Sequence, residues 1–351
     1  MAPETNFSGK QTKARKADHI RICLTKDVNF KKGAGFDQFT FDAVSLQHNA
    51  LPEVKRAEID TSTSFLNKPF RAPLLISPMV GGTEEAERLN KHLATAAERL
   101  GLGMGVGSQR AMLKDPSLVK TYLIRDVAPS IFLAGNIGGA QLLESTPKEI
   151  INLATQIEAD ALYVHLNPAQ ELAQPEGDTD WRQVTERIRV LAKAAPFPIL
   201  IKEVGNGISG AVASRLVKNG VAAIDVAGAG GTNWVKVEHH RQSEGSARAK
   251  PFFEWGVPTS DCIIQVRQAE PLIPLIASGG IRTGSDVAKA IALGANLAGI
   301  AKPLLQPATE SADAVQKTLE TIIEELKDVM FLVGVKCIAD LGSATISEKG
   351  K

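Results

Sequence analysis

Short apolar runs recur eight times along this chain of 351 residues, and this recurrence constrains the fold more than any other feature. Each run has four or five residues, the length of a buried β-strand. Helical stretches separate most of the runs, and several of these end in glycine, the residue favoured just after a helix. The runs are PLLIS (73–77), GMGV (103–106), IFLAG (131–135), LYVHL (162–166), ILIK (199–202), AAIDV (222–226), PLIAS (274–278) and LAGIA (297–301).

This alternation predicts an α/β fold in which eight parallel strands close into a TIM (β/α)8 barrel. Crossovers between parallel strands are right-handed, and a closed sheet leaves no edge exposed. An open, doubly wound sheet is the alternative fold. Barrels often exceed about 250 residues as one domain, so the length fits one barrel with extensions. We divide the chain into a basic N-terminal arm, residues 1–40, and the barrel, residues 41–351.

Two further segments can be placed from their patterns. Residues 310–335 have helical apolar spacing and are predicted to cover the barrel as its last helix. Residues 230–255 form a long polar connection with glycine at intervals, which is typical of a lid or a disordered segment.

The overall composition excludes several functional classes. Lys plus Arg total 40 and Asp plus Glu total 39, so no long-range field would attract nucleic acid or a membrane surface. We find no apolar stretch of about 18 residues and no signal peptide, so no membrane partner is expected. Three scattered cysteines without CxxC spacing favour a reduced, cytoplasmic setting.

Glycine and polar residues follow nearly every apolar run, and in a barrel these positions gather on one functional face. Gly279, Gly280 and Arg282 follow the seventh run, and Ala301 and Lys302 follow the eighth. This is the usual place for a phosphate site, because glycine lets backbone N–H groups approach an anion. A glycine pair by itself would more often be a simple turn.

Lys202 closes an otherwise apolar strand, where a cation is costly unless it meets an anion or a polar ligand. An electron-rich ring atom of a cofactor would satisfy it. The alternative is a salt bridge to Glu203 or Asp225.

The densest polar cluster follows the fourth run, where His165, Asn167, Gln170 and Glu171 surround Pro168. Mg²⁺ prefers oxygen ligands and is commonly held by one or two carboxylates together with phosphate oxygens. The cluster therefore suits a hard metal and a diphosphate. Taken alone, His165 could equally be a hydrogen-bonded core histidine.

The N-terminal arm carries adjacent cations, Arg15 and Lys16, which could clamp a diphosphate. On charge alone, the basic run from Lys10 to Lys32 would more often be a solvated face. Local sequence does not place the arm on the barrel.

Eight motifs, in this order, resemble those of the FMN-dependent, type 2 isopentenyl-diphosphate isomerases over residues 15–335. The motifs are RKADH (15–19), LQHNALPE (46–53), SPMVGG (77–82), GSQR (107–110), HLNPAQE (165–171), IKEVGNG (201–207), GAGGTN (228–233) and ASGGIR (277–282). Any one of them alone would be weak evidence.

The resemblance implies that FMN binds at the barrel mouth, with its phosphate beside the last two strand ends. The implied contacts are Pro78, Met79, Val80, Ser108, Asn136, Lys202, Thr232, Gly280, Ile281, Arg282, Ala301 and Lys302. Val80 departs from the family pattern, because many relatives have threonine there. A required hydroxyl would put flavin affinity in doubt, whereas a backbone contact would change little.

The resemblance also implies the reaction: isopentenyl diphosphate becomes dimethylallyl diphosphate in isoprenoid biosynthesis, with reduced FMN as the acid/base cofactor and NADPH needed only to reduce it. Glu171 would bind Mg²⁺, and the catalytic side chains would be Gln170 and His165. The implied substrate contacts are Arg15, Lys16, Ser108, Gln109, Arg110, His165, Asn167 and Gln170. A homo-tetramer or homo-octamer is expected.

The sequence is compatible with two other functions. An FMN-dependent 2-hydroxy-acid oxidase or dehydrogenase would share the barrel and would carry a histidine near an arginine after strand six, where this chain has His239, His240 and Arg241. It would not account for RKADH or HLNPAQE. A non-catalytic flavin-binding barrel is the second alternative.

Overall fold

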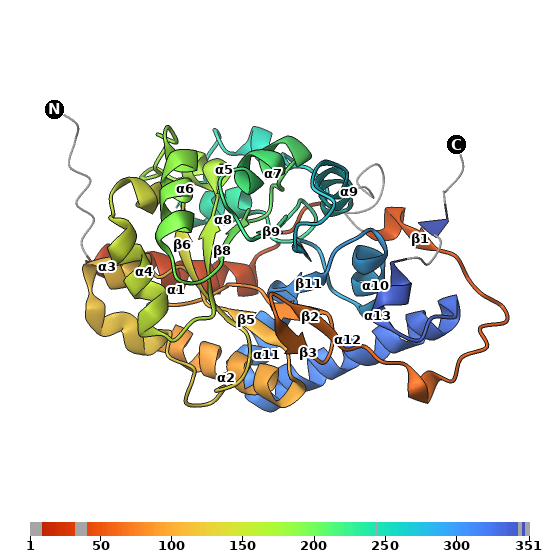
Figure 1. Cartoon of the computed structure of the whole chain (residues 1–351). Coiled ribbons are helices and arrows are strands. Elements are labelled where there is room, and N and C mark those ends of the chain that lie inside the picture. The colour runs from red at the N-terminus through yellow and green to blue at the C-terminus, as the bar shows by residue number, and fades with distance from the viewer. Residues whose placement is uncertain (1–8, 32–40, 243–244, 343–345, 348–351) are drawn as a thin grey trace.

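The computed structural model describes residues 9–31, 41–242, 245–342 and 346–347. Parts of the predicted arm and the predicted boundary at residue 40 fall in 1–8 and 32–40, outside the described residues. Figure 1 shows the barrel strands surrounded by helices, with the long helix α12 (Ala312–Val333) along one side.

Eight parallel strands close into a barrel, which confirms the predicted fold and shows that the open-sheet alternative is wrong. Every predicted apolar run overlaps one of these strands. In chain order they are β4 (Leu74–Ile76), β5 (Gly103–Gly105), β6 (Leu133–Gly138), β7 (Ala161–His165), β8 (Ile199–Lys202), β9 (Ala223–Asp225), β10 (Leu275–Ser278) and β11 (Leu297–Ile300). Pairing of β11 with β4, with Ala298 opposite Leu74, closes the ring.

Alternation along the strands separates an outer from an inner core. On β7, Leu162 and Val164 pack outward with the helix-facing cluster, whereas Ala161 and Tyr163 belong to the cluster inside the barrel. The hairpin of β2 (Thr63–Phe65) and β3 (Lys68–Phe70) contributes its two phenylalanines to the inner cluster. The hairpin precedes β4 directly and plugs the end where the strands begin, so a ligand must enter at the opposite end.

The surrounding helices carry ordinary start signals and apolar faces. Thr146 and Glu149 form a reciprocal capping box at the start of α4, and Thr283 and Asp286 form another at α10. The principal helices are α2 (Glu84–Leu100), α4 (Pro147–Gln156), α6 (Val184–Ala194), α7 (Gly210–Val217), α9 (Thr259–Ala269), α10 (Gly284–Ala292) and α11 (Lys302–Glu310). Helix α12 packs on α2, α10 and α11, as predicted for a helix that covers the barrel, although the short α13 (Ile338–Leu341) follows it.

The N-terminal arm folds as α1 (Gly9–Thr25) and packs against α8 (Trp234–Arg241). Of the two alternatives expected for the polar connection at 230–255, a disordered segment does not describe its α8 and its short η6 (Lys250–Phe252), whereas the alternative of a lid stays a prediction. Helix α8 has few apolar positions, and buried polar residues that contact α1 and α5 (Pro168–Ala173) hold it in place. Residues 243–244 of the connection are outside the described part of the chain.

The remaining elements are short connections around this frame. They are η2 (Phe41–Ala43), β1 (Ser45–Leu46), η3 (Arg56–Glu58), α3 (Arg110–Lys114), η4 (Pro116–Thr121), η5 (Ala140–Leu143) and β12 (Ile346–Ser347), which pairs with β1.

Candidate active site

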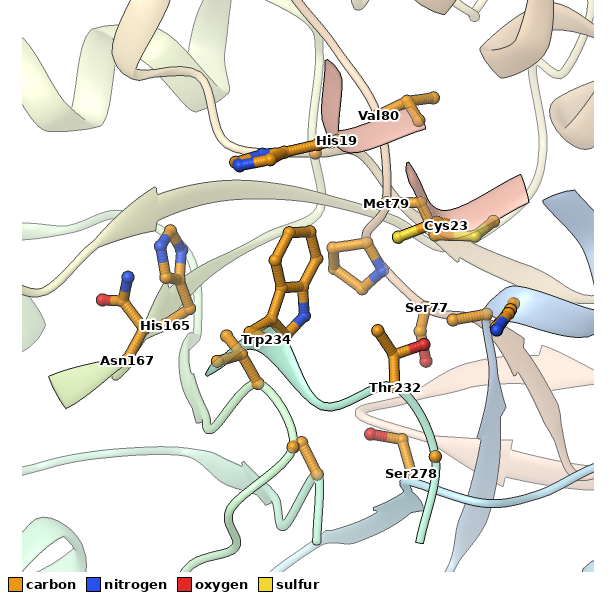
Figure 2. Close-up of a pocket in the computed structure, with 18 of the residues that line it drawn as sticks. His19, Cys23, Ser77, Met79, Val80, His165, Asn167, Thr232, Trp234 and Ser278 are labelled. Carbon is orange, nitrogen blue, oxygen red and sulfur yellow. The ribbon is translucent and has the colours of Figure 1, made fainter. Parts of the chain in front are cut away.

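A cavity of about 590 Å³ opens at the ends of the barrel strands and is covered by α1. Every site residue predicted from the sequence lines this cavity except Gln109. Figure 2 shows His19 and Cys23 of α1 above the cavity, with Trp234, His165 and Thr232 from the barrel side below them.

The structure does not bring the Gln109 side chain into the cavity, so the predicted substrate contact is not supported there. Gln109 is fully buried, and its Nε2 atom donates to the carbonyl of Leu153 at 2.7 Å. Its Oε1 atom accepts from the backbone N–H of Asn136 at 3.0 Å. The residue therefore fixes the β5–β6 loop from the outer side of the barrel.

The period of two along each strand brings the polar residues at the strand ends onto the inner wall. Because Leu75, Ala134, Tyr163, Leu200 and Ile276 point inward, the residues two positions later also point inward. These later residues are Ser77, Asn136, His165, Lys202 and Ser278, and all of them line the cavity.

The loops after β10 and β11 form a region suited to a phosphate. Gly279 and Gly280 have φ values of +100° and +88°, which side chains rarely adopt. An added Cβ on Gly279 would lie 2.2 Å from the Gly228 carbonyl oxygen, so the backbones approach too closely for any other residue. Helix α11 begins beside this glycine pair at Lys302, and its N-terminus adds a favourable dipole for an anion.

Two cations in this region have only neutral hydrogen-bond partners within the part of the chain that the structure describes. Arg282 donates to the carbonyls of Gly280 and Gly230, both at 2.8 Å, and Lys302 donates to the Asn29 side-chain oxygen at 3.3 Å. Burial lowers the pKa of both cations, which an anion would reverse. Asn29, which the sequence did not indicate, comes from the segment after α1 and pairs with Thr232 across an antiparallel bridge.

Lys202 is buried at the end of β8 and has no ion pair within 4.0 Å among the described residues. Its ammonium donates to the backbone carbonyl of Glu203, so the predicted alternative of a direct salt bridge is absent from that part of the chain. Burial lowers the pKa of Lys202, while Asp225 and Glu203 oppose this effect. An electron-rich cofactor atom above the lysine would fit.

Lys16 of α1 reaches into the cavity and also has no ion-pair partner among the residues that the structure describes. Its Nζ atom donates to the Ser108 carbonyl at 2.9 Å and to the Tyr122 hydroxyl at 2.8 Å. Burial and the neighbouring Arg15 lower its pKa to about 7. Arg15 donates to the Gln174 amide oxygen at 3.1 Å, while its buried Nε atom has no hydrogen-bond partner in the described part of the chain.

His165 is neutral in this environment. Burial, with the charges of Lys202 and Arg110, lowers its pKa to about 3. Its Nδ1 atom lies 2.9 Å from the Asn136 side-chain oxygen. The imidazole can therefore take part in hydrogen bonds but cannot contribute a positive charge at neutral pH.

Glu171 lies at the other end of the cavity in α5. Its Oε1 atom accepts from the Asn167 amide at 2.8 Å, and its Oε2 atom accepts from the backbone N–H of Asp178 at 2.9 Å. Burial raises its pKa despite these bonds, and a bound cation would lower it again. Arg110 lies 3.5 Å from the Asp178 carboxylate.

The donors around Glu171 are oxygen atoms and amides, which suit Mg²⁺. No group of three or more His, Cys, Asp or Glu residues that could hold a metal was found in the described ranges. A metal here would need oxygen ligands from a substrate and water, which is how Mg²⁺ is commonly bound.

Glu238 of α8 joins α1 to α5 and was missed from the sequence. Its carboxylate accepts from His19 and Gln170 at 2.9 Å each, and from Arg241 at 2.7 Å. Burial alone would raise its pKa, but these bonds and charges outweigh burial and lower the pKa to about 2. Nothing local in the sequence marks this glutamate, because its partners come from two distant helices.

The histidines expected for the oxidase alternative do not reach the cavity. His239 bonds to Ser246, and Arg241 pairs with Glu238 and Glu176. His239, His240 and Arg241 are all absent from the described cavity lining. Trp234 occupies the wall instead, with its ring edge-on to His19 at 5.1 Å between centroids.

Sequence and structure comparisons first define a class. The FMN-dependent dehydrogenase family matches residues 139–348. A solved lactate oxidase from Pediococcus acidilactici has a TM-score of 0.67 at 17% identity, covering 98% of this chain and 94% of that chain. A mandelate oxidase has a TM-score of 0.64 at 16% identity, with coverages of 98% and 99%. The match over residues 139–348 shows that the chain is an FMN-dependent barrel protein, and the two solved structures share the fold.

Within that class, the most similar relatives that we compared are isomerases. Isopentenyl-diphosphate delta-isomerase from Nostoc sp. is 48% identical over 338 residues, covering 95% of each chain. The enzymes of that name from Synechococcus sp. and Rickettsia bellii are 47% and 44% identical, covering 90% and 95% of this chain and 91% and 96% of theirs. The chain belongs to the isopentenyl-diphosphate delta-isomerase family, which confirms the resemblance.

Proposed function

We propose that this protein converts isopentenyl diphosphate to dimethylallyl diphosphate at the cavity covered by α1. The observation that carries this proposal is Lys16, a half-buried residue beside Arg15 whose ammonium has only neutral hydrogen-bond partners among the described residues. Glu171 lines the same cavity. A diphosphate supplies the missing negative charge for the cations and oxygen ligands for a metal on the glutamate. An oxidase acting on a single carboxylate would not need this arrangement.

The described residues fit FMN at the barrel mouth. The glycine pair and the cations Arg282 and Lys302 offer a phosphate site, and Lys202 offers a cation without a close ion-pair partner. We assign the flavin contacts to Pro78, Met79, Val80, Ser108, Asn136, Lys202, Thr232, Gly280, Ile281, Arg282, Ala301 and Lys302. The Val80 carbonyl accepts from Gly107 at 2.9 Å, and its aliphatic side chain requires that any flavin contact at this position be made without a hydroxyl.

Isomerisation requires one proton to be added to an alkene carbon and another to be removed two carbons away, through a tertiary cation-like state. Reduced FMN, when bound, supplies the acid/base group for this exchange without net redox change. The protein contributes binding, orientation and exclusion of water. NADPH is proposed only as the reductant that prepares the flavin.

The diphosphate is assigned to cations and amides from three elements: Arg15 and Lys16 from the arm, Ser108 and Arg110 from the end of β5, and His165, Asn167 and Gln170 near the end of β7. Glu171 is the proposed ligand for Mg²⁺. Arg110, now 3.5 Å from Asp178, can reach the same region. In this proposal the arm contributes to the substrate site through Arg15 and Lys16 of its described part, residues 9–31.

Proton handling by side chains is limited to hydrogen bonding. Gln170 cannot titrate, and Glu238 and Asn167 fix its amide by bonds of 2.9 and 3.2 Å. Its oriented amide can position the reacting isoprenyl group or relay a proton through a hydrogen bond. With a pKa of about 3, His165 is a poor proton donor at neutral pH, so we assign it an orienting role through Asn136.

The setting of the protein follows the family. We propose a homo-tetramer or homo-octamer in the cytoplasm, with a small-molecule substrate and no nucleic-acid or membrane partner. Within the described residues, no helix is both long and apolar enough to span a bilayer.

The decisive experiment is an anaerobic assay of the purified protein with isopentenyl diphosphate, FMN, Mg²⁺ and NADPH. Product formation that requires reduced flavin and stops on chelation of Mg²⁺ is expected. Reduction of bound flavin by a 2-hydroxy acid, without isomerisation, would favour the oxidase alternative. Bound flavin with neither activity would favour a non-catalytic barrel.

A further inference from the structure

Two buried polar residues, Asp225 and Tyr163, lie inside the barrel below the cavity lining. Asp225 on β9 is fully buried and is not part of that lining. Its Oδ1 atom accepts from the Ser278 hydroxyl at 2.6 Å and from the backbone N–H of Ala227 at 3.2 Å. Its Oδ2 atom and the hydroxyl of Tyr163 on β7 are both buried, and neither has a hydrogen-bond partner in the described ranges. A buried carboxylate with an unused oxygen must have a compensating charge nearby.

Lys202 supplies that charge. Lys202 and Asp225 are register partners on the adjacent strands β8 and β9. Leu200 and Ala223, two residues earlier on each strand, belong to the inner cluster, so both side chains point into the barrel. The two charges therefore face the same interior space.

Glu203 is the competing carboxylate, but it leaves the strand on the opposite side from Lys202, because consecutive residues alternate. Its Oε2 atom accepts hydrogen bonds from the backbone N–H groups of residues 204–207, whereas its Oε1 atom has no hydrogen-bond partner among the described residues. Asp225 also raises the pKa of Lys202 more than Glu203 does. On its other side, β8 pairs with β7, where His165 is the register partner of Lys202 and is neutral. Tyr163, two residues earlier on β7, also points into the barrel.

We propose that Asp225 is the buried counter-ion that keeps Lys202 in its ammonium form, so that Lys202 stabilises negative charge on reduced flavin. The proposal rests on the FMN site proposed above. A lone buried lysine tends to release its proton to solvent. Without Asp225, Lys202 would become neutral, and the reduced flavin would retain the proton on its pyrimidine nitrogen N1 instead of losing it.

The direction in which the anionic fraction of reduced flavin changes shows whether Asp225 acts through Lys202 or directly on the flavin. A carboxylate acting directly on the flavin would disfavour the anion, so its removal would increase the anionic fraction. A carboxylate acting through Lys202 has the opposite consequence. The measured quantity is the ratio of anionic to neutral reduced flavin, which the near-ultraviolet spectrum distinguishes.

The test uses the full-length holoprotein, reduced anaerobically and titrated with pH in the absence of substrate. Asp225→Asn is expected to bind FMN but to lower the anionic-to-neutral ratio about tenfold at pH 7, equivalent to one pKa unit. Tyr163→Phe keeps both charges, and Glu203→Gln removes the other nearby charge, so each should change the ratio less than about threefold, well under one unit. In a Lys202→Met background, Asp225→Asn should have no further effect.

Three outcomes would overturn the proposal: an unchanged or higher ratio in Asp225→Asn, a larger effect from Glu203→Gln, or additive effects with Lys202→Met. If Asp225→Asn yields no folded holoprotein, Ser278→Ala removes one of the two bonds to Asp225 and should lower the ratio less, in the same direction. An unchanged ratio in that variant counts against the proposal. Flavin content and isomerase activity of the unmodified protein test the proposed function separately.

Discussion

Glu238 should stabilise the docked arm only while it is ionised, and Glu238→Gln tests this. The variant keeps the size of the side chain, but its amide NH₂ group is a donor and cannot accept the hydrogen bonds that Gln170, His19 and Arg241 donate to the carboxylate. In the folded protein the pKa of Glu238 falls from 4.5 to about 2. Because the folded value is depressed, the stabilisation is complete above the unfolded pKa and is lost as the pH falls towards the folded one. Between pH 6 and pH 3 this amounts to about 2 kcal/mol of unfolding free energy.

The assay is urea unfolding at several pH values in that range, followed by circular dichroism, with hydrogen exchange reporting on α1. The wild-type protein should lose about 2 kcal/mol more than the variant between pH 6 and pH 3, because only the wild type titrates at this position. Exposed Glu186, which pairs with Arg189 on the surface, provides a matched control as Glu186→Gln, since exposed pairs contribute little. Parallel curves for the wild type and Glu238→Gln would refute the reasoning.

Four further predictions concern the proposed site. Lys16 should lose its proton as the pH rises through about 7, so substrate affinity should fall there; Lys16→Arg should remove this dependence, and an unchanged KM profile would contradict the assignment. Glu171→Gln should raise the Mg²⁺ concentration for half-maximal activity about tenfold or more, because it removes the carboxylate proposed to bind the metal, while the FMN content should stay unchanged. Full activity at low Mg²⁺ would exclude the metal role. Arg282→Met should weaken FMN binding about tenfold or more but leave riboflavin binding unaltered, as expected for a lost phosphate contact; equal losses for both flavins would argue against it. Gln170→Asn shortens the amide away from Glu238 and should reduce kcat, measured with reduced flavin; full turnover would remove Gln170 from the mechanism.

The strands and the floor of the cavity followed from local sequence. Each apolar run predicted its own strand, and the alternation of side chains then determined which residues point inward. His165 and Lys202 are examples, since each closes a strand and needs no distant contact to reach the cavity. The fold prediction was confirmed for this reason, while the ligand assignments stay predictions.

Errors arose where distant segments decide the outcome. Gln109 lies within a motif next to true lining residues, yet its side chain turns towards Leu153 because a carbonyl there requires a donor. Helix α8 was not predicted within the polar connection at 230–255, because its polar residues are buried by contacts with α1 and α5 that no local pattern encodes.

By itself, the sequence determined the closed barrel, its functional end and the family, because these depend on periodicity and on motifs at strand ends. Tertiary structure alone decided that α1 covers the cavity, that Glu238 links the arm to Gln170, and that Asp225 faces Lys202 from the next strand. The physical reason is range: strand formation and side-chain direction are set within a few residues, whereas these pairings join groups from separate elements, and burial gives them their strength.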